Sequence, residues 1–431
     1  MKKTTIKTDN NIFNIFLNSI FMLFILTVLL CGCTKESVET EADLPSASEE
    51  LAQKQLLSKD KEHPFEYRLN TFMPRDRNYV FSPLSIKMSL DLAANGADGV
   101  TKEEIIDTIA VEDIEKFNSY EKQLISTYVN NGDIQIKLAN SLWLNTDRAK
   151  KLNFSDLYLR TIGRMNNAKL GNVTNKDAVD TINVWCSQNT NGKITEIIDN
   201  NEFSAALVNA LYFSGKWTKP FSGGTQVRTF NERGGNSADI TFMSNTDEYN
   251  YYEDSEVKMI ELPYGLTKEV KDANKDDKNA PDSVDIAMYV VLNGDRRMEL
   301  SPYMDILSPE KVNVTLPVFT VAYGAEYNEP LKQLGVNTAF DSKNADFHYM
   351  TGVDKPKLSI DKVAHEAYIT VDENGTEAAP AEKTAYSSEE PDDQPEEIKE
   401  FIANEPFTFI IVDKRMNEVL FMGEYAYAEV D

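Results

Sequence analysis

Apolar residues recur along parts of this chain at the spacing of an amphipathic helix. Within residues 176–190, Val179, Ile182 and Cys186 stand three and four positions apart, so they share one face of a helix. Ser82 and Pro83 precede the largely apolar segment 84–97, an arrangement typical of a capped helix start. The pattern therefore predicts helices over 176–190 and 84–97.

Other stretches alternate between apolar and polar residues or are apolar throughout. Residues 134–138 and 312–316 alternate, as half-buried strands do. Residues 286–292 and 407–412 are continuously apolar, which fits strands that are buried on both faces. Because helical and strand segments follow one another without a regular β-α-β order, the sequence predicts a single-domain α+β fold with a large sheet and several helices.

Three polar segments interrupt this pattern and are expected to be surface loops. Residues 231–239 form a polar turn region, and residues 267–282 are charged and contain Asn and Pro. Residues 386–405 are the most unusual, because the stretch 389–405 contains eight acidic residues and a single base, Lys399. Repulsion between like charges keeps such a segment extended and solvated.

The N-terminal residues have the composition of a secretory signal. Three lysines precede an apolar run over residues 20–30, which ends in Leu30-Cys31-Gly32-Cys33. The run is short for a membrane-spanning helix, and an uncleaved membrane anchor is the alternative. The tetrapeptide resembles a bacterial lipobox, in which the last residue, here Cys33, is lipidated and becomes the new N-terminus. Residues 1–32 are therefore expected to be a lipoprotein signal peptide.

The segment after Cys33 separates this signal from the body of the protein. Residues 33–50 are polar and acidic, and they are expected to form a flexible tether to the membrane. Residues 51–431 contain no internal repeat and no Gly- or Pro-rich break, so they are expected to form one domain. The sequence thus predicts a secreted, membrane-anchored lipoprotein that faces the extracellular space at the cell surface.

Charge restricts the partners of this body. The chain has 44 Lys and Arg against 70 Asp and Glu, which gives a net charge of −26, while 41% apolar residues are ample for a packed core. A field this acidic repels nucleic acids, heparin-like polyanions and anionic membrane surfaces. None of the three is therefore expected as a partner.

Signatures of common enzymes are missing. The three histidines, His63, His348 and His365, are not at metal-ligand spacing, and no phosphate loop, dinucleotide fingerprint or Gly-x-Ser-x-Gly occurs. Three cysteines cannot form a disulfide framework, and Cys186 is expected to be a small buried hydrophobe. No metal, cofactor or catalytic residue is predicted, and the remaining enzymatic alternative is a pair of carboxylates.

Seven segments resemble, in the same order, those of the serpin family of protease inhibitors. They are residues 78–86 (NYVFSPLSI), 138–143 (LANSLW), 182–194 (INVWCSQNTNGKI), 208–217 (VNALYFSGKW), 370–379 (TVDENGTEAA), 405–407 (EPF) and 421–423 (FMG). The resemblance covers roughly residues 55–431. It implies the serpin fold, with a large central β-sheet, additional sheets, eight or nine helices and an exposed reactive-centre loop at about residues 373–405.

The resemblance also implies a function. Serpins are suicide inhibitors of extracellular serine endopeptidases, with cysteine endopeptidases as an alternative target, and they act as monomers without enzymatic activity. The protease cleaves the loop and is held as an acyl complex while the loop inserts as a new strand of the main sheet. The inserted strand gains on the order of ten hydrogen bonds at ~1 kcal/mol net each. A kinetic barrier prevents this gain in free energy until the loop is cleaved.

The resemblance assigns structural roles to particular residues. Gly375 supplies conformational freedom at the hinge of the loop, and small residues beyond it fit between strands. The implied polar cluster beneath the opening point of the sheet includes His365 as a structural switch, and Trp217 is expected at the top of the opening. The hinge residues are Glu373, Gly375, Thr376, Glu377, Ala378, Ala379 and Ala381, and the polar cluster is Ser82, Ser85, Asn209 and His365.

The bond that a protease would cut is less well defined. The family's usual spacing from Glu373 places it between Glu389 and Glu390, which would suit a glutamate-selective protease. The segment from Gly375 to Pro406 is longer than the family pattern, so other positions stay open as alternatives. They are Ala385, Tyr386 and Ser388.

Two residues depart from the family pattern and define an alternative function. Residues alternate between faces in a strand, so Thr376, Pro380 and Glu382 would all turn toward the core on insertion. Proline cannot donate a ladder hydrogen bond, and a buried carboxyl is costly unless it is paired. The alternative is therefore a non-inhibitory serpin that acts as a protease substrate or as a binding module.

Overall fold

A computed structural model describes residues 63–129, 134–165, 168–265, 285–294, 298–376 and 397–429 of this chain. These residues all belong to one compact unit, Leu51–Asp431. No helix in the described ranges has the length and apolar composition needed to cross a membrane. The predicted signal peptide, the tether with Cys33 and the expected loop at 267–282 lie outside the described residues.

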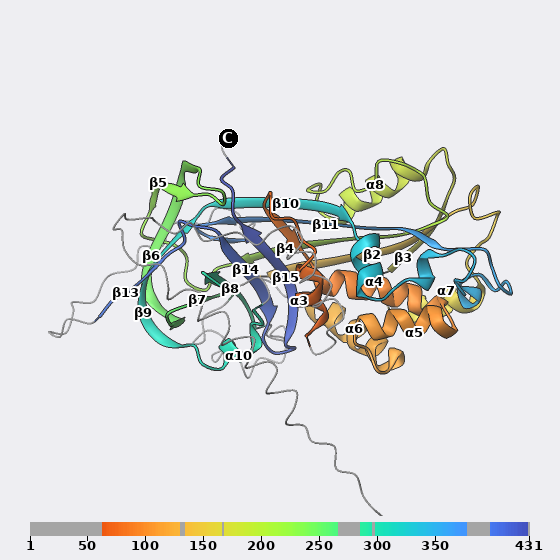
Figure 1. Cartoon of the computed structure of the whole chain (residues 1–431), viewed down its shortest axis with the longest axis horizontal. Helices are drawn as coiled ribbons and strands as arrows, with labels where there is room; N and C mark the ends of the chain where they lie inside the picture. Colours follow the sequence, from red (N-terminus) through yellow and green to blue (C-terminus); the bar gives the residue numbers. More distant parts are fainter. Residues whose placement is uncertain are drawn as a thin grey trace, which may run out of the picture. The chain divides into compact units, whose positions relative to one another are not determined.

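Two β-sheets form the framework of this unit (Figure 1). The larger sheet comprises, in the described part of the chain, nine strands: β1 (Tyr79–Phe81), β15 (Glu418–Tyr425), β14 (Phe407–Asp413), β8 (Ile286–Leu292), β7 (Lys258–Pro263), β6 (Ser237–Glu253), β9 (Ser308–Pro317) and β13 (Lys399–Ile402), with β5 (Thr225–Asn231) paired to β6. The second sheet has six strands in the order β10 (Phe319–Glu326), β11 (Ile360–Asp372), β12 (Gly375–Thr376), β4 (Ala205–Lys216), β2 (Ile134–Asn145) and β3 (Ala168–Val173).

Helices cover both faces of the six-stranded sheet. Within the described residues there are nine α-helices: α3 (Phe65–Asn70), α4 (Pro83–Gly96), α5 (Gly99–Thr108), α6 (Ile114–Val129), α7 (Asp156–Met165), α8 (Ala178–Asn189), α10 (Ser301–Met304), α11 (Asn328–Leu334) and α12 (His348–Thr351). Figure 1 shows α8 on one side of the sheet and the group α4 to α7 on the other. This mixture of separate sheets and helices confirms the predicted α+β fold in a single domain.

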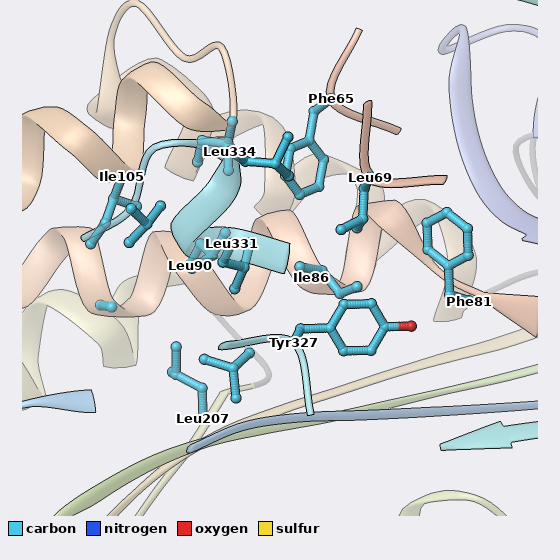
Figure 2. Packing of buried hydrophobic residues seen from close by; sticks show 14 of the residues in the cluster. Phe65, Leu69, Phe81, Ile86, Leu90, Ile105, Leu207, Tyr327, Leu331 and Leu334 are labelled. Carbon is cyan, nitrogen blue, oxygen red and sulfur yellow. The ribbon is translucent and has the colours of Figure 1, made fainter. Parts of the chain in front are cut away.

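The helix start predicted at Ser82 is present. The side chain of Ser82 accepts a hydrogen bond from the backbone N–H of Ser85, and Pro83 occupies the first turn of α4, where no N–H is needed. The apolar side of α4 then packs into the core. Figure 2 shows its Ile86 and Leu90 in one cluster with Leu207 of β4 and side chains from α3, α5 and α11.

A second apolar cluster joins the two sheets. Leu211 and Phe213 of β4 and Ile369 of β11 belong to it, together with Met288 and Val290 from the continuously apolar strand β8. The strand predicted from that apolar run is therefore buried as expected. The sheets thus hold each other on one face, while α8 covers the other face of β4 near Ile182 and Cys186.

Two predicted loop ranges are wrong at their ends. Residues 237–239 belong to strand β6, so the turn between β5 and β6 is shorter than predicted. Lys399–Ile402 forms strand β13 beside β9, within the segment that we expected to be solvated. Its alternation is the physical reason: Phe401 is fully buried while Glu400 and Ile402 face outward, and the acidic residues around it obscured this signal.

Candidate functional site: the seam between β4 and β11

The centre of the six-stranded sheet contains a seam between two parallel strands. β4 and β11 pair directly from Ala205 and Ile360 as far as Tyr212 and Tyr368. Parallel strands bond with slanted ladders that are slightly less stable than antiparallel ones. Beyond Tyr212 and Tyr368 the direct pairing stops, and a third strand lies between the two.

That third strand is β12, the hinge of the predicted reactive loop. After β11 the chain reverses at Glu373 and Asn374, and Gly375 and Thr376 then pair antiparallel with both neighbours. Thr376 lies opposite Gly215 of β4 and opposite Val371 of β11. The first two hinge residues are therefore already inserted into the seam.

Trp217 holds the turn that begins this insertion. Its indole Nε1–H donates to the carbonyl of Asp372 at 2.9 Å, and its backbone N–H donates to the carbonyl of Asn374 at 2.9 Å. Gly375 has a φ of 154°, and a Cβ there would lie 2.1 Å from the carbonyl oxygen of Gly215. Only glycine fits this close approach, so the turn depends on Gly375.

Thr376 is fixed inside the sheet by a single polar contact. Its Oγ1 lies 2.6 Å from the hydroxyl of Tyr264, and both residues are fully buried. The Tyr264 ring stacks on Trp217 with centroids 4.4 Å apart and meets Phe213 edge to face at 5.0 Å. Tyr264, the hydroxyl partner of Thr376, is thus itself held in place by two aromatic rings.

A buried polar cluster lies lower in the same seam. Asn209 of β4 is in register with His365 of β11, and the two side chains are hydrogen-bonded through His365 Nδ1 and Asn209 Oδ1. The backbone N–H of Ser82 donates to His365 Nε2 at 2.9 Å. Because Nε2 accepts this bond, the proton of the neutral ring lies on Nδ1 and is donated to Asn209.

The cluster extends to β2 through another amide. Asn140 pairs in register with Asn209, and its Oδ1 accepts hydrogen bonds from the hydroxyls of Ser85 and Ser89 on α4, each at 3.3 Å. The Nδ2 of Asn209 is buried and has no hydrogen-bond partner among the described residues. A buried donor without a partner is costly, so this nitrogen makes the closed seam less stable than full pairing would.

Burial controls the protonation of His365. The ring is fully buried, and this desolvation lowers its pKa to about 3 from an ordinary value of 6.5. His365 is therefore neutral near pH 7 and can accept the hydrogen bond from Ser82. Protonation would remove the acceptor and place a charge inside the sheet.

The structure brings together most of the residues predicted for the cluster and the opening. His365 bonds both Ser82 and Asn209, and Ser85 bonds Ser82 directly. Trp217 lies at the end of the seam where β12 enters. Glu373, Gly375 and Thr376 form the turn and β12. The remaining hinge residues and the bait positions lie outside the described residues: Glu377, Ala378, Ala379, Ala381, Ala385, Tyr386, Ser388, Glu389 and Glu390.

Sequence analysis missed two contributors to the site. Asn140 lies in a segment that we matched to the family but was not singled out, although an asparagine in a largely apolar strand is a usable signal. Tyr264 follows β7, and only the tertiary structure shows that it reaches Thr376. No cluster of His, Cys, Asp or Glu in the described residues is arranged to hold a metal ion.

Comparisons with known proteins define the class of this fold. The sequence model of the family described as "Serpin (serine protease inhibitor)" matches residues 67–428. The chain is 28% identical to an uncharacterized serpin-like protein of Methanosarcina acetivorans, with 95% of this chain and 98% of that protein covered.

Two solved structures are similar as well. The crystal structure of Serpin48, a highly specific serpin of the insect Tenebrio molitor, superimposes with a TM-score of 0.70 at 25% identity over 88% of this chain and 99% of the other. Human thyroxine-binding globulin in complex with its hormone superimposes with a TM-score of 0.71 over 88% of this chain and 99% of the other, and at 19% identity it shows the fold alone.

The chain belongs to the serpin family. It has the serpin fold, and membership supports a protease-inhibitor type of function in general. The same fold occurs in thyroxine-binding globulin, whose structure contains a bound small ligand.

The ring of His365 makes the seam sensitive to acid. The pKa of His365 is lower in the folded than in the unfolded state, so protonation at low pH favours the unfolded state. The folded state therefore has its full stability above pH 6.5 and loses stability as the pH falls from 6.5 toward about 3. By pH 4 the loss is on the order of 3 kcal/mol. Urea unfolding of wild type and His365→Gln gives the free energy of unfolding at each pH between 7 and 4, and we expect it to depend less steeply on pH in the variant. If the free energy of unfolding has the same slope against pH in both proteins, His365 is not held neutral.

Proposed function

We propose that this chain is a lipid-anchored serpin that traps extracellular serine endopeptidases, with cysteine endopeptidases as further targets, by inserting its cleaved loop into the six-stranded sheet. The observation that carries the proposal is strand β12, whose residues Gly375 and Thr376 already pair with both β4 and β11. A longer inserted strand would continue this pairing in the same register. The serine hydroxyl of the protease attacks the bait carbonyl, an ester forms, and the amine of the next residue leaves with a proton. Insertion then competes with hydrolysis of that ester.

The register of β12 supports a specific expectation for where each following residue would enter. Thr376 is opposite Gly215 and Val371, so a residue four positions later, Pro380, would lie opposite Leu211 and Ala367. Proline lacks one N–H and thus removes one ladder bond. The loss is one bond of about ten, at ~1 kcal/mol each, so Pro380 slows insertion without cancelling its driving force.

The second departure from the family pattern becomes favourable in this register. Six positions after Thr376, Glu382 would lie opposite both Asn209 and His365. When the seam opens, His365 Nδ1–H loses Asn209, and the Asn209 Nδ2–H is already without a partner. A carboxylate entering between them can accept from both groups. Glu382 therefore supports the inhibitory function over the substrate-only alternative.

The hinge provides the direct test of the trap. Thr376→Arg cannot fit the buried seat beside Tyr264, so it should turn an inhibitor into a substrate: cleavage without a covalent complex. Thr376→Val, which fills the same volume, is the control and should still trap the protease.

The measurement is a denaturing gel with elastase-like, chymotrypsin-like and glutamate-specific proteases, plus mass spectrometry of the released peptide. A stable complex with Thr376→Arg would exclude insertion, and cleavage of the wild type without a complex would favour the non-inhibitory alternative.

Glu382 has a separate signature. Glu382→Leu should leave His365 and Asn209 without partners in the inserted form, at a cost of about 1–3 kcal/mol per buried group. More molecules should then be cleaved for each one trapped, by about thirtyfold or more if the whole cost, at least ~2 kcal/mol for the two groups, slows insertion. Lys383→Leu is the matched control, because strand alternation would turn residue 383 to the opposite face of an inserted strand. If Glu382→Leu traps better than wild type, the inserted carboxyl is a hindrance and the pairing is wrong.

Attachment to the membrane rests on the sequence of residues 30–33. We infer that Cys33 carries the lipid and that residues 33–50 tether the body at the cell surface, without an enzymatic activity or a cofactor. Cys33→Ser should abolish incorporation of labelled palmitate and release the protein from membranes, whereas Cys31→Ser should change neither. Unchanged labelling of Cys33→Ser would contradict the lipidation.

A further inference from the structure

One end of the body carries a concentration of basic residues that its overall charge conceals. Between residues 148 and 169 there are six Lys and Arg and one acid, Asp156, in a chain with a net charge of −26. This segment contains the turn after β2, helix α7 and the start of β3. We call it, together with residues 349–357 beside it, the α7 end.

Five cations of the α7 end have no acidic partner among the described residues. Lys150, Lys151, Arg160, Arg164 and Lys169 are exposed and form no ion pair within the described ranges. Of the acids nearby, Asp346 holds His348 and lies in the field of Lys355, and Asp147 accepts the backbone N–H of Asn175. Asp156 and Asp354 are exposed within the α7 end and leave it with an excess of positive charge. The positive charge is therefore available to a partner.

Three lysines at this end have a strained backbone. Lys150, Lys151 and Lys355 have φ values of 51°, 63° and 48°, in the left-handed region that glycine and asparagine tolerate best. Of the other non-glycine residues described with such angles, three are asparagines and one is Ala110. Lysine at three such positions breaks the local preference, and strain of this kind concentrates at functional sites.

Apolar side chains lie exposed among these cations. Leu157 of α7, Tyr349 of α12 and Val353 are 56%, 43% and 44% exposed. They come together because Ser155, at the start of α7, bonds the carbonyls of Tyr349 and Met350. On α7 itself, Leu157, Arg160 and Arg164 follow at helical spacing and share one stripe. A surface of Lys and Arg with exposed Leu and Tyr fits the headgroup region of an anionic bilayer.

We propose that the α7 end docks on anionic phospholipid headgroups. The net charge of the protein does not prevent this, because charges farther than about 8 Å away are screened at physiological salt. The hinge and the α7 end lie at opposite ends of β4: Gly375 pairs at Lys216, whereas Ala205 pairs with Leu144, next to the turn that leads to α7. Strand β4 spans about 35 Å. Docking therefore points the reactive loop away from the membrane, toward soluble proteases.

This orientation rests on the proposed function, but the docking itself can be tested independently. Residues 51–431 form a compact unit without Cys33, so they can be used free of lipid. We expect them to bind vesicles of 30% phosphatidylglycerol in phosphatidylcholine at least tenfold more tightly than pure phosphatidylcholine, and to be released by high salt. The assay contains no protease, so its failure would leave the inhibitory mechanism untouched.

Matched variants identify the surface. Arg160→Glu with Arg164→Glu should weaken binding at least tenfold, whereas Lys116→Glu with Lys122→Glu, which changes the net charge equally on α6, should change it less than twofold. Lys150→Gly with Lys151→Gly should also weaken binding without lowering the midpoint of urea unfolding, because glycine relieves the strain. Equal binding by the α7 and α6 variants would overturn the proposal.

Leu157 separates a membrane from a soluble polyanion. Leu157→Ser should weaken binding to anionic vesicles several-fold and leave binding to heparin unchanged, since only a bilayer offers the leucine an apolar environment. If Leu157→Ser binds vesicles like wild type while Arg160→Glu with Arg164→Glu loses both ligands, the α7 end is a general polyanion site and the assignment to a membrane is wrong.

Discussion

The pairing of β4 with β11 is the constraint on which the rest of this structure depends. Along Ala205–Tyr212 the two strands bond directly, and only above that point does β12 stand between them. Any further residue that enters must break a parallel ladder, but it replaces that ladder with two antiparallel ones. In the mechanism that we propose, the uncut chain cannot make this exchange because its loop is joined at both ends to strands, to β12 in one sheet and to β13 beside β9 in the other. Cutting the loop would release one end and let the protein reach a deeper free-energy minimum.

The polar cluster explains how the seam can be closed and yet remain able to open. Apolar packing would hold β4 and β11 together at all stages, whereas the bond between His365 and Asn209 can be exchanged for another polar partner. The unpartnered Nδ2 of Asn209 already makes the closed state less favourable than it would otherwise be. Neutral His365 keeps the closed form intact at neutral pH because it accepts the Ser82 N–H. In the proposed mechanism the cluster would thus act as a reversible clamp within the stretch of β4 and β11 that insertion must separate.

Much of the fold could be predicted from the sequence because its signals are local. The cap at Ser82, the alternation in 134–138 and the apolar runs that became β8 and β14 all specify an element without knowledge of its neighbours. Strand β13 was missed because four residues of alternation sit among acidic residues that dominate any window average. Tyr264 was missed because its partner, Thr376, is 112 residues away. The consequence of Glu382 cannot be judged from burial alone, since only the register of β12 indicates which groups this side chain would meet on insertion.

The most direct measurement of this account is the stability of the protein after its loop has been cut. The wild type is nicked by a protease that cleaves anywhere in the segment after Thr376, and its unfolding temperature is compared with that of the intact chain. Insertion of the freed strand, at on the order of ten hydrogen bonds, predicts an increase of roughly 10–20 °C. An unfolding temperature that stays the same or falls after cleavage would show that the seam does not accept the loop, and the account of β12 as the start of an insertion would be wrong.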